Sequence, residues 1–273
     1  VYPDSKPIRF WINTVNGTVI NLDDIIGEDA SSLIINPRNN REIFGLKGGQ
    51  LVRADIDSRQ NIKIGPANVT SLVINKGFIY TLENLTPATN GQFLVRYDLN
   101  GGGRYVLAQY PPLSKSPWSI KVSKLNGSDY IALGDPSNGA LYVIKNDGQK
   151  ILSSSLGENI RLYLFNSTGR FLSYYQADTF KTIDLEYVER FSKVNEKVTN
   201  LTWFTDYQVI VSKADGPYIA DFSGENMIKL PPNIADLSAL KLSYISPTKS
   251  IYYISAGKLY YYSLQPKGSL INF

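Results

Sequence analysis

Cysteine and histidine are both absent from the 273 residues of the chain. The chain therefore cannot form a disulfide, use a thiolate nucleophile, build a zinc site of Cys and His ligands or assemble a Ser-His-Asp triad. No apolar run approaches the roughly 18 residues needed to cross a bilayer, and no run of Lys and Arg is long enough for a nucleic-acid-binding tract. These absences exclude most familiar hydrolase and redox chemistries and predict that the partner is not nucleic acid.

The residues that are present suffice for a folded domain. Apolar residues make up 43% of the chain, and the 28 basic and 24 acidic residues leave a net charge of only +4. A length near 270 residues fits one large core, so we expect a single domain over residues 1–273. The chain begins at Val1 rather than Met, which indicates that a secretory signal or a tag preceded it.

A short phrase recurs along the chain: a glycine, any residue, then an apolar or aromatic residue that opens a strand. Its average spacing is about 40 residues, a period typical of repeat folds. The copies are Gly17-Thr18-Val19, Gly49-Gln50-Leu51, Gly91-Gln92-Phe93, Gly139-Ala140-Leu141, Gly216-Pro217-Tyr218, Gly257-Lys258-Leu259 and, with Asp in place of Gly, Asp178-Thr179-Phe180. We interpret each copy as the turn of a β-hairpin.

Each hairpin has a further run on either side, so a unit contains four short antiparallel strands. Ser32–Asn36 and Ser71–Asn75 are examples of the leading run. Seven such units predict an all-β fold, a seven-bladed β-propeller. A pair of sandwiches or a long barrel is the alternative, although neither requires a constant period. Helix signals are nearly absent, and the best candidate is the short segment Ile234–Leu242, between two blades.

The two ends of the chain indicate how the ring closes. The N-terminal unit offers Ile8–Asn13, Thr18–Leu22 and a third short strand, Ile25–Gly27, but no leading run. Ser269–Phe273 at the C-terminus matches the leading runs of other units, so we expect the two ends to complete one blade jointly. In the alternative, Ser269–Phe273 is the fourth strand of the last blade.

The segment Tyr130–Gly148 resembles a blade of the β-propeller superfamily, in particular repeats of the YVTN, NHL and lactonase-like groups. The resemblance implies the fold and no activity. It covers the chain as architecture, whereas only this copy is similar residue by residue.

Six Asn-x-Ser/Thr sequons are the strongest functional signal. They are Asn16, Asn68, Asn84, Asn126, Asn166 and Asn200. Five end in Thr, whereas the composition predicts about one Asn-x-Thr by chance. Most lie in predicted turns, where a bulky sugar is accommodated; the alternative is that Asn, Ser and Thr are simply common in turns. We therefore expect an extracellular glycoprotein. Its cysteine-free composition resembles that of secreted surface proteins of thermoacidophilic archaea or their viruses.

Carboxylates are the remaining candidates for catalysis. They cluster at Asp23-Asp24, Glu28-Asp29 and Asp184 with Glu186. A glycosidase needs two carboxylates flanking a cleft, but Asp23, Asp184 and Asp221 share a place in their repeats where Asp ordinarily caps a turn. Asp135, in Gly-Asp-Pro-Ser-Asn-Gly, is likewise expected to form a turn rather than bind calcium. We assign no catalytic, cofactor or metal residue.

Aromatic residues are abundant, with 19 Tyr, 11 Phe and 3 Trp. Tyr252-Tyr253 and Tyr260-Tyr261-Tyr262 would place rings on both faces of adjacent strands. Packing between blades is the favoured interpretation and a protein- or sugar-binding surface the other. Trp118 and Trp203 lie in predicted leading strands and are expected in the core.

The sequence thus predicts a non-catalytic recognition or structural module of a cell or virion surface, for example in a surface layer or filament. Its partners would be surface proteins or glycans, within a larger symmetric assembly. The alternatives are a secreted Asp/Glu-dependent glycoside hydrolase or calcium-dependent lactonase and, less favoured, a sensor with a ligand in the channel.

Overall fold

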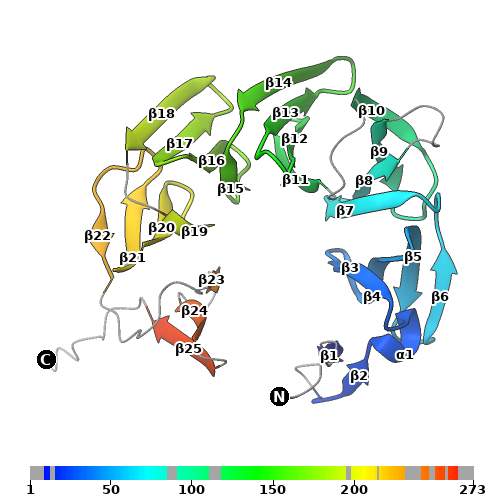
Figure 1. Cartoon of the computed structure of the whole chain (residues 1–273). Helices are drawn as coiled ribbons and strands as arrows, with labels where there is room; N and C mark the ends of the chain where they lie inside the picture. The colour runs from blue at the N-terminus through cyan, green and yellow to red at the C-terminus, as the bar shows by residue number, and fades with distance from the viewer. Residues whose placement is uncertain are drawn as a thin grey trace, which may run out of the picture. The chain divides into compact units, whose positions relative to one another are not determined.

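The computed structural model describes residues 9–12, 16–84, 91–110, 118–194, 198–213, 215–230, 241–245, 250–255 and 258–263. In this part the chain consists almost entirely of short antiparallel strands, and each strand pairs with the next one in sequence within its sheet (Figure 1). Five of the described sheets have four strands, one has three and one has two. The predictions of an all-β chain and of a four-stranded unit are confirmed.

The first half of the chain forms a two-stranded sheet, one short helix and two four-stranded sheets. The two-stranded sheet and the helix are β1 (Phe10–Ile12), β2 (Val19–Asn21) and α1 (Asp23–Ile26). The β3–β6 sheet comprises β3 (Ala30–Asn36), β4 (Asn39–Lys47), β5 (Gln50–Asp55) and β6 (Gln60–Lys63). The β7–β10 sheet comprises β7 (Val69–Asn75), β8 (Phe78–Asn84), β9 (Gln92–Asp98) and β10 (Tyr105–Tyr110).

The second half repeats the pattern. The β11–β14 sheet comprises β11 (Ser119–Leu125), β12 (Ser128–Gly134), β13 (Leu141–Asn146) and β14 (Ile151–Gly157). The β15–β18 sheet comprises β15 (Ile160–Phe165), β16 (Phe171–Gln176), β17 (Thr179–Asp184) and β18 (Glu189–Val194). The β19–β22 sheet comprises β19 (Val198–Trp203), β20 (Gln208–Lys213), β21 (Gly216–Asp221) and β22 (Ile228–Lys229). The three-stranded sheet comprises β23 (Lys241–Ile245), β24 (Ser250–Ser255) and β25 (Lys258–Ser263).

The chain divides into two compact units. The first consists of residues 1–122, 131–137 and 144–153, and the second of residues 123–130, 138–143 and 154–273. The first unit contains the sheets up to β10, and its strands β3 and β4 contact β7. The second unit contains the sheets from β15 onward, in which β15 contacts β19 and β19 contacts β23. Within each unit, the first strands of consecutive sheets are therefore neighbours.

The recurring glycine phrase lies where it was predicted, at the hairpin between the second and third strands. Lys47 pairs with Gln50 across Gly48 and Gly49, whose φ angles are +56° and +80°. A two-residue turn with both φ angles positive matches the right-handed twist of the strands, and glycine adopts it without steric cost. In the copy that lacks glycine, Ala177 takes a φ of +50° between β16 and β17.

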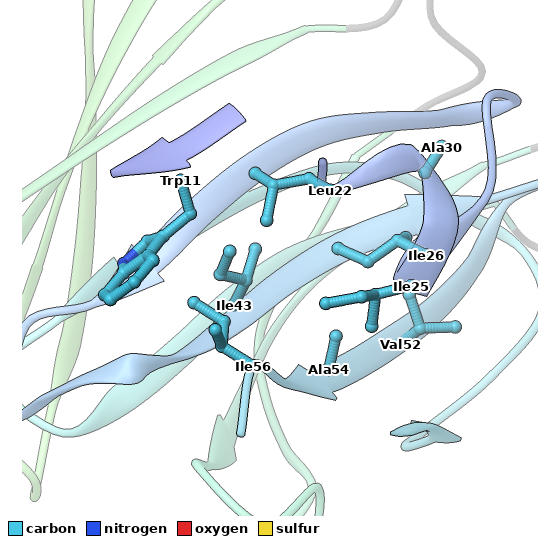
Figure 2. Close-up of a cluster of buried hydrophobic side chains, with 9 residues drawn as sticks. All are labelled: Trp11, Leu22, Ile25, Ile26, Ala30, Ile43, Val52, Ala54 and Ile56. Atoms are coloured by element: carbon cyan, nitrogen blue, oxygen red, sulfur yellow. The ribbon is translucent and has the colours of Figure 1, made fainter. Parts of the chain in front are cut away.

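Apolar side chains pack between consecutive sheets. Figure 2 shows the first such cluster, in which Trp11 and α1 cover the apolar side of the β3–β6 sheet. A second cluster joins the β3–β6 and β7–β10 sheets through Phe44, Leu72 and their neighbours. A third joins the β15–β18 and β19–β22 sheets around Phe171 and Trp203. Trp118 and Trp203, predicted to lie in leading strands and in the core, are both buried; Trp203 ends β19 and Trp118 directly precedes β11.

Several first strands contain a β-bulge that the sequence analysis did not predict. The pairing register shifts in β3, β7, β15 and β19. In two of these strands the extra residue is a threonine, Thr70 or Thr199, whose hydroxyl donates a hydrogen bond of 3.3 Å to a main-chain carbonyl of the second strand. A bulge bends and twists its strand, and its recurrence shows that it belongs to the repeating unit.

The prediction of a third strand at Ile25–Gly27 is wrong, because Ile25 and Ile26 belong to helix α1 and Gly27 directly follows it. A strand would point Ile25 and Ile26 to opposite faces, whereas the helical turn buries both in the cluster of Figure 2. Asp23 and Asp24 favour a helix start, and the side chain of Asn21 accepts the Asp23 N–H at 3.0 Å.

The other terminal predictions fall largely on residues that the structure does not describe. Of the helix predicted at Ile234–Leu242, only Lys241 and Leu242 are described, and they belong to β23 rather than to a helix. Ser269–Phe273 also lies outside the described residues. Strands β24 and β25 are adjacent, as predicted, and their register sets Tyr252 opposite Tyr261 and Tyr253 opposite Tyr260. Among the described helices, none has the length and apolarity of a membrane span.

Candidate functional surface

The third strand of most sheets ends in Asp or Asn, and this side chain holds the following turn. Its Oδ1 atom accepts a main-chain N–H two or three residues later, at 2.7 to 3.2 Å. The residues are Asp55, Asn146, Asp184 and Asp221, and Asn21 does the same at the end of β2, the second strand of the two-stranded sheet. These are Asx turns. The turn-forming role expected for Asp184 and Asp221 thus agrees with their geometry, while Asp23 lies two residues past the equivalent position.

Asp184 is buried and bound to an arginine. Its Oδ2 atom accepts hydrogen bonds from Arg170 Nε at 2.9 Å and Nη2 at 2.6 Å. Its Oδ1 atom accepts the main-chain N–H groups of Glu186 and Tyr187 at 2.9 and 3.3 Å. Burial raises the pKa of Asp184, but the Arg170 and main-chain hydrogen bonds outweigh it and hold the pKa below the usual value. The carboxylate remains charged and has no oxygen atom to offer a substrate.

The arginine of this pair occupies a repeated position that sequence reasoning missed. The carbonyl oxygens of Arg9, Arg41 and Arg170 each accept a hydrogen bond of 2.8 Å from the main-chain N–H of the residue after Asn21, Asp55 or Asp184, respectively. Their guanidinium groups pair with Asp23, Asp57 and Asp184. In the β19–β22 sheet the same position holds Tyr207, whose carbonyl accepts the Phe222 N–H at 2.8 Å. The signal in the sequence was an acid 14 to 16 residues after each arginine.

Aromatic rings connect this position in the β15–β18 sheet with its neighbour in the β19–β22 sheet. Phe171 stacks on Phe222 and Trp203, with centroid separations of 4.7 and 6.0 Å. Tyr207 meets Phe171 edge-on at 5.9 Å. Arg170 lies 5.0 Å from the ring centroids of both Phe171 and Tyr187. The Tyr187 ring is thus held by a cation–π contact with Arg170, and the Tyr207 ring by its edge-on contact with Phe171.

The outer side of this cluster is exposed and apolar. Tyr187, Val188 and Tyr207 are 63%, 75% and 55% exposed. Val188 has a φ of +60°, a conformation that is costly for a β-branched residue and that often marks a functional position. Glu186 pairs with Arg170 at 3.4 Å. We call Arg170, Glu186, Tyr187, Val188 and Tyr207 the Tyr187–Tyr207 surface; it is the best candidate for binding in the described part of the chain.

A second cluster surrounds a buried carboxylate, Glu83, in β8. Glu83 accepts hydrogen bonds from the hydroxyls of Tyr97 and, at 3.3 Å, Thr81, and from Arg104 Nη2 at 3.0 Å. Burial, and then the hydrogen bond to Glu83, raises the pKa of Tyr97. The Tyr97, Thr81 and Arg104 side chains all donate to the Glu83 carboxylate. We therefore interpret the cluster as a structural hydrogen-bond network of the β7–β10 sheet.

Four of the other carboxylates singled out in the sequence are also engaged. Asp23 accepts hydrogen bonds from Arg9, and Asp24 accepts the Asn21 side chain at 3.1 Å. Asp29 lies 3.8 Å from Lys47. Asp135 accepts the main-chain N–H and the hydroxyl of Ser137, as a turn former does. Among the described residues no three Asp or Glu side chains gather as a metal site would require.

The six sequon asparagines differ in exposure. Four are exposed and Asn200 is half-buried; the exposed ones are Asn16, Asn68, Asn84 and Asn126. Asn166 is only 4% exposed. Its amide group donates to the Thr168 hydroxyl at 2.8 Å and to the Asp206 carbonyl at 3.1 Å, and its oxygen accepts the Phe171 N–H. Attachment of a sugar to Asn166 would break contacts that join two turns.

No family model and no curated protein matches the chain, whereas solved structures do. A chain of a mitotic checkpoint complex is 10% identical with a TM-score of 0.61, covering 94% of this chain and 81% of that one. The extracellular domain of the one component system BT4673 from B. thetaiotaomicron is 14% identical with a TM-score of 0.57, covering 87% and 35%. The dehydrogenase NirN, in complex with DHE, is 10% identical with a TM-score of 0.56, covering 82% and 50%.

These likenesses agree with the succession of four-stranded antiparallel sheets. The fold is of the β-propeller type. The chain spans about a third of the length of the BT4673 extracellular domain. At these identities the comparisons establish the fold alone, and function has to be argued from the surface described above.

Proposed function

We propose that the chain is an extracellular, N-glycosylated β-propeller that acts as a non-catalytic recognition or structural module of a cell or virion surface. The observation that carries this proposal is the Tyr187–Tyr207 surface, in which the exposed ring of Tyr187 packs on Arg170 of the Arg170–Asp184 ion pair and that of Tyr207 packs on Phe171. Tyrosine and arginine are enriched at the centres of protein–protein interfaces because they bury a large area at low entropic cost. The partner that fits is therefore another surface protein.

Two further observations support the extracellular assignment. Most of the sequon asparagines are exposed, and one similar solved structure is an extracellular domain. That same structure belongs to a one component system, which keeps a sensor role as the second candidate. The carboxylates proposed for a hydrolase, in contrast, are bound to arginine or to turn N–H groups.

Removing both exposed tyrosines tests the binding surface. We expect Tyr187→Ala with Tyr207→Ala to weaken binding of the purified protein to the surface of the cells or virions that produce it by about tenfold or more, since hot-spot truncations commonly cost over 1 kcal/mol each. The measurement is a binding isotherm with labelled protein. Tyr105→Ala is the matched control, because Tyr105 is 43% exposed on β10 and lies outside this surface. Equal binding of all three proteins would contradict the proposal.

Glycopeptide mapping of the protein from its natural source tests the modification sites. We expect sugar on the exposed asparagines, such as Asn16 and Asn126, reduced occupancy at half-buried Asn200, and a bare Asn166. The reason is access: the Asn166 amide is enclosed by hydrogen bonds, whereas Asn126 lies in an exposed turn. Bare asparagines at every site, or occupancy of Asn166 equal to that of Asn126, would contradict this.

We further propose that the sheets are seven blades of a closed ring and that Ser269–Phe273 supplies the missing first strand beside β1. Support comes from the 40-residue repeat and from β1 and β2, which correspond to the second and third strands of a blade. Deletion of Ser269–Phe273 is then expected to remove hydrogen-exchange protection from Phe10–Ile12 while β25 stays protected. Loss of protection in β25 alone would support the alternative, that the segment completes the last sheet.

A further inference from the structure

Strand β14 is an outer strand without the charges, the proline or the short length that often protect a sheet edge. Among the described strands it has one neighbour in its sheet, β13. Its seven residues contain no charged residue and no proline. Leu152 is 47% exposed, and Ser153, Ser154 and Ser155 are exposed as well. A long edge strand of this kind presents main-chain N–H and C=O groups that can pair with another strand.

The fourth strands of the other described sheets are protected in different ways. β6 has only four residues and ends in Lys63, and β22 has only two, including Lys229. β18 carries Glu189, Arg190 and Lys193, and β10 is interrupted by a bulge. Short length, charges and bulges are the devices by which natural sheets avoid pairing at their edges. Among these five strands, β14 alone combines seven residues with no charge.

The sequence of β14 is complementary to itself. Leu152-Ser153-Ser154-Ser155-Leu156 reads the same in both directions. When two copies pair antiparallel about Ser154, Leu152 of one lies opposite Leu156 of the other, and Ser153 lies opposite Ser155. Leucine pairs and serine pairs are favourable across strands, and no like charges meet. A two-fold axis at Ser154 makes both halves of the contact identical, as in the commonest type of homodimer.

We propose that the protein forms a two-fold symmetric dimer by antiparallel pairing of β14 with β14 of a second copy. The two four-stranded sheets then join into one continuous sheet. This dimer goes beyond the proposed function, because it requires neither glycans nor a surface location. A single strand pair buries less area than a standard interface, so we expect association at micromolar concentrations. Self-complementarity is what favours a second copy over an unrelated peptide.

The absence of cysteine makes a crosslinking test specific. Ser154→Cys places the only thiol of the full-length chain at the proposed axis, where paired residues lie about 4.5 to 5.5 Å apart between Cα atoms, within the range for a disulfide. Ser153→Cys and Ser155→Cys are the matched controls, because each pairs with a serine and lies two residues away from its own counterpart. Under mild oxidation we expect Ser154→Cys to crosslink at least tenfold faster than either control.

Sedimentation of the uncrosslinked full-length protein provides the second measurement. We expect a concentration-dependent dimer for the unmodified chain. For Ser154→Lys, which sets two ammonium groups opposite each other, we expect a dimer dissociation constant at least tenfold higher. Gln60→Lys adds the same charge to exposed strand β6 and should dimerise normally. Circular dichroism reports folding of each variant. A monomer up to about 100 µM, equal crosslinking of the three cysteine variants, or an unaffected Ser154→Lys dimer would each overturn the proposal.

Discussion

Phe171→Ala is expected to lower the free energy of unfolding by about 3 to 5 kcal/mol, the range found for removing a buried phenylalanine. Phe171 is fully buried between the β15–β18 and β19–β22 sheets, where it stacks on Trp203 and Phe222. For a chain of this size, the melting temperature should fall by about 10 °C. The measurement is thermal unfolding followed by far-UV circular dichroism.

A near-UV signal makes this prediction specific to the aromatic cluster. Loss of Phe171 frees the rings of Trp203 and Tyr207, so their near-UV bands should weaken even below the melting temperature. Tyr105→Ala removes an exposed ring of similar size and should change the free energy of unfolding by less than about 1 kcal/mol. If both substitutions shift the melting temperature equally, the cluster is not the core that we describe.

Asp184→Asn is expected to destabilise the protein by about 2 kcal/mol at neutral pH, because a buried, charge-assisted hydrogen-bond network loses its charge. The effect should depend on pH. The pKa of Asp184 is lowered in the folded protein, so its contribution is complete above the unfolded pKa of about 4. It is lost as the pH falls through the lower folded-state value. The difference in melting temperature between the unmodified chain and the variant should shrink below pH 4.

Asp57→Asn is the matched control for this substitution. Asp57 lies 3.2 Å from Arg41, which occupies the repeat position of Arg170, but the Asp57 side chain is largely exposed. Exposed ion pairs contribute about 0 to 1 kcal/mol, so this variant should melt close to the unmodified chain at every pH. A constant effect of Asp184→Asn from pH 7 to pH 2 would show that packing, and not the charge, is responsible.

Several turn carboxylates share the direction of this shift. Hydrogen bonds from Lys229 and Tyr218 lower the pKa of Asp215 to about 2. Those from Ser58 lower the pKa of Asp55. In Asp221, hydrogen bonds from the turn and from Asn226 outweigh desolvation and lower the pKa. These groups keep their negative charge in moderate acid, which limits the rise of net positive charge that would otherwise destabilise the fold.

The hairpins could be predicted from the sequence because their information is local. A turn that needs positive φ selects glycine, and β-branched and aromatic residues on either side of it indicate the two strands. Even so, Ala177 adopts positive φ in one hairpin, where the repeat rather than the residue type indicated the turn. The repeat therefore carried information that no single unit contained.

The bulges and helix α1 could not be predicted, because tertiary packing decides them. Threonine is an ordinary strand residue, so nothing in the sequence marks Thr70 or Thr199 as a bulge. Only the pairing with the second strand identifies each as the extra residue. Ile25 and Ile26 suit a strand as well as a helix. Their burial against Ile43 and Val52 decided the outcome.

The binding surface could be predicted only in part for a similar reason. The sequence marked Asp184 as a turn former, and its Asx turn agrees with that. It did not reveal that Arg170, 14 residues earlier, would meet Asp184 across a hairpin and support Tyr187. Nor could a local sequon distinguish Asn166, which tertiary hydrogen bonds enclose, from exposed Asn126.

The location of the apolar clusters has an evolutionary consequence. Each described cluster is shared by two consecutive sheets, so the essential compatibility is between one repeat and the next. Duplication or loss of a repeat would therefore require new complementarity at a single junction, while the remaining junctions keep their partners. A gene of this kind can change the number of its units by recombination without redesigning the whole chain.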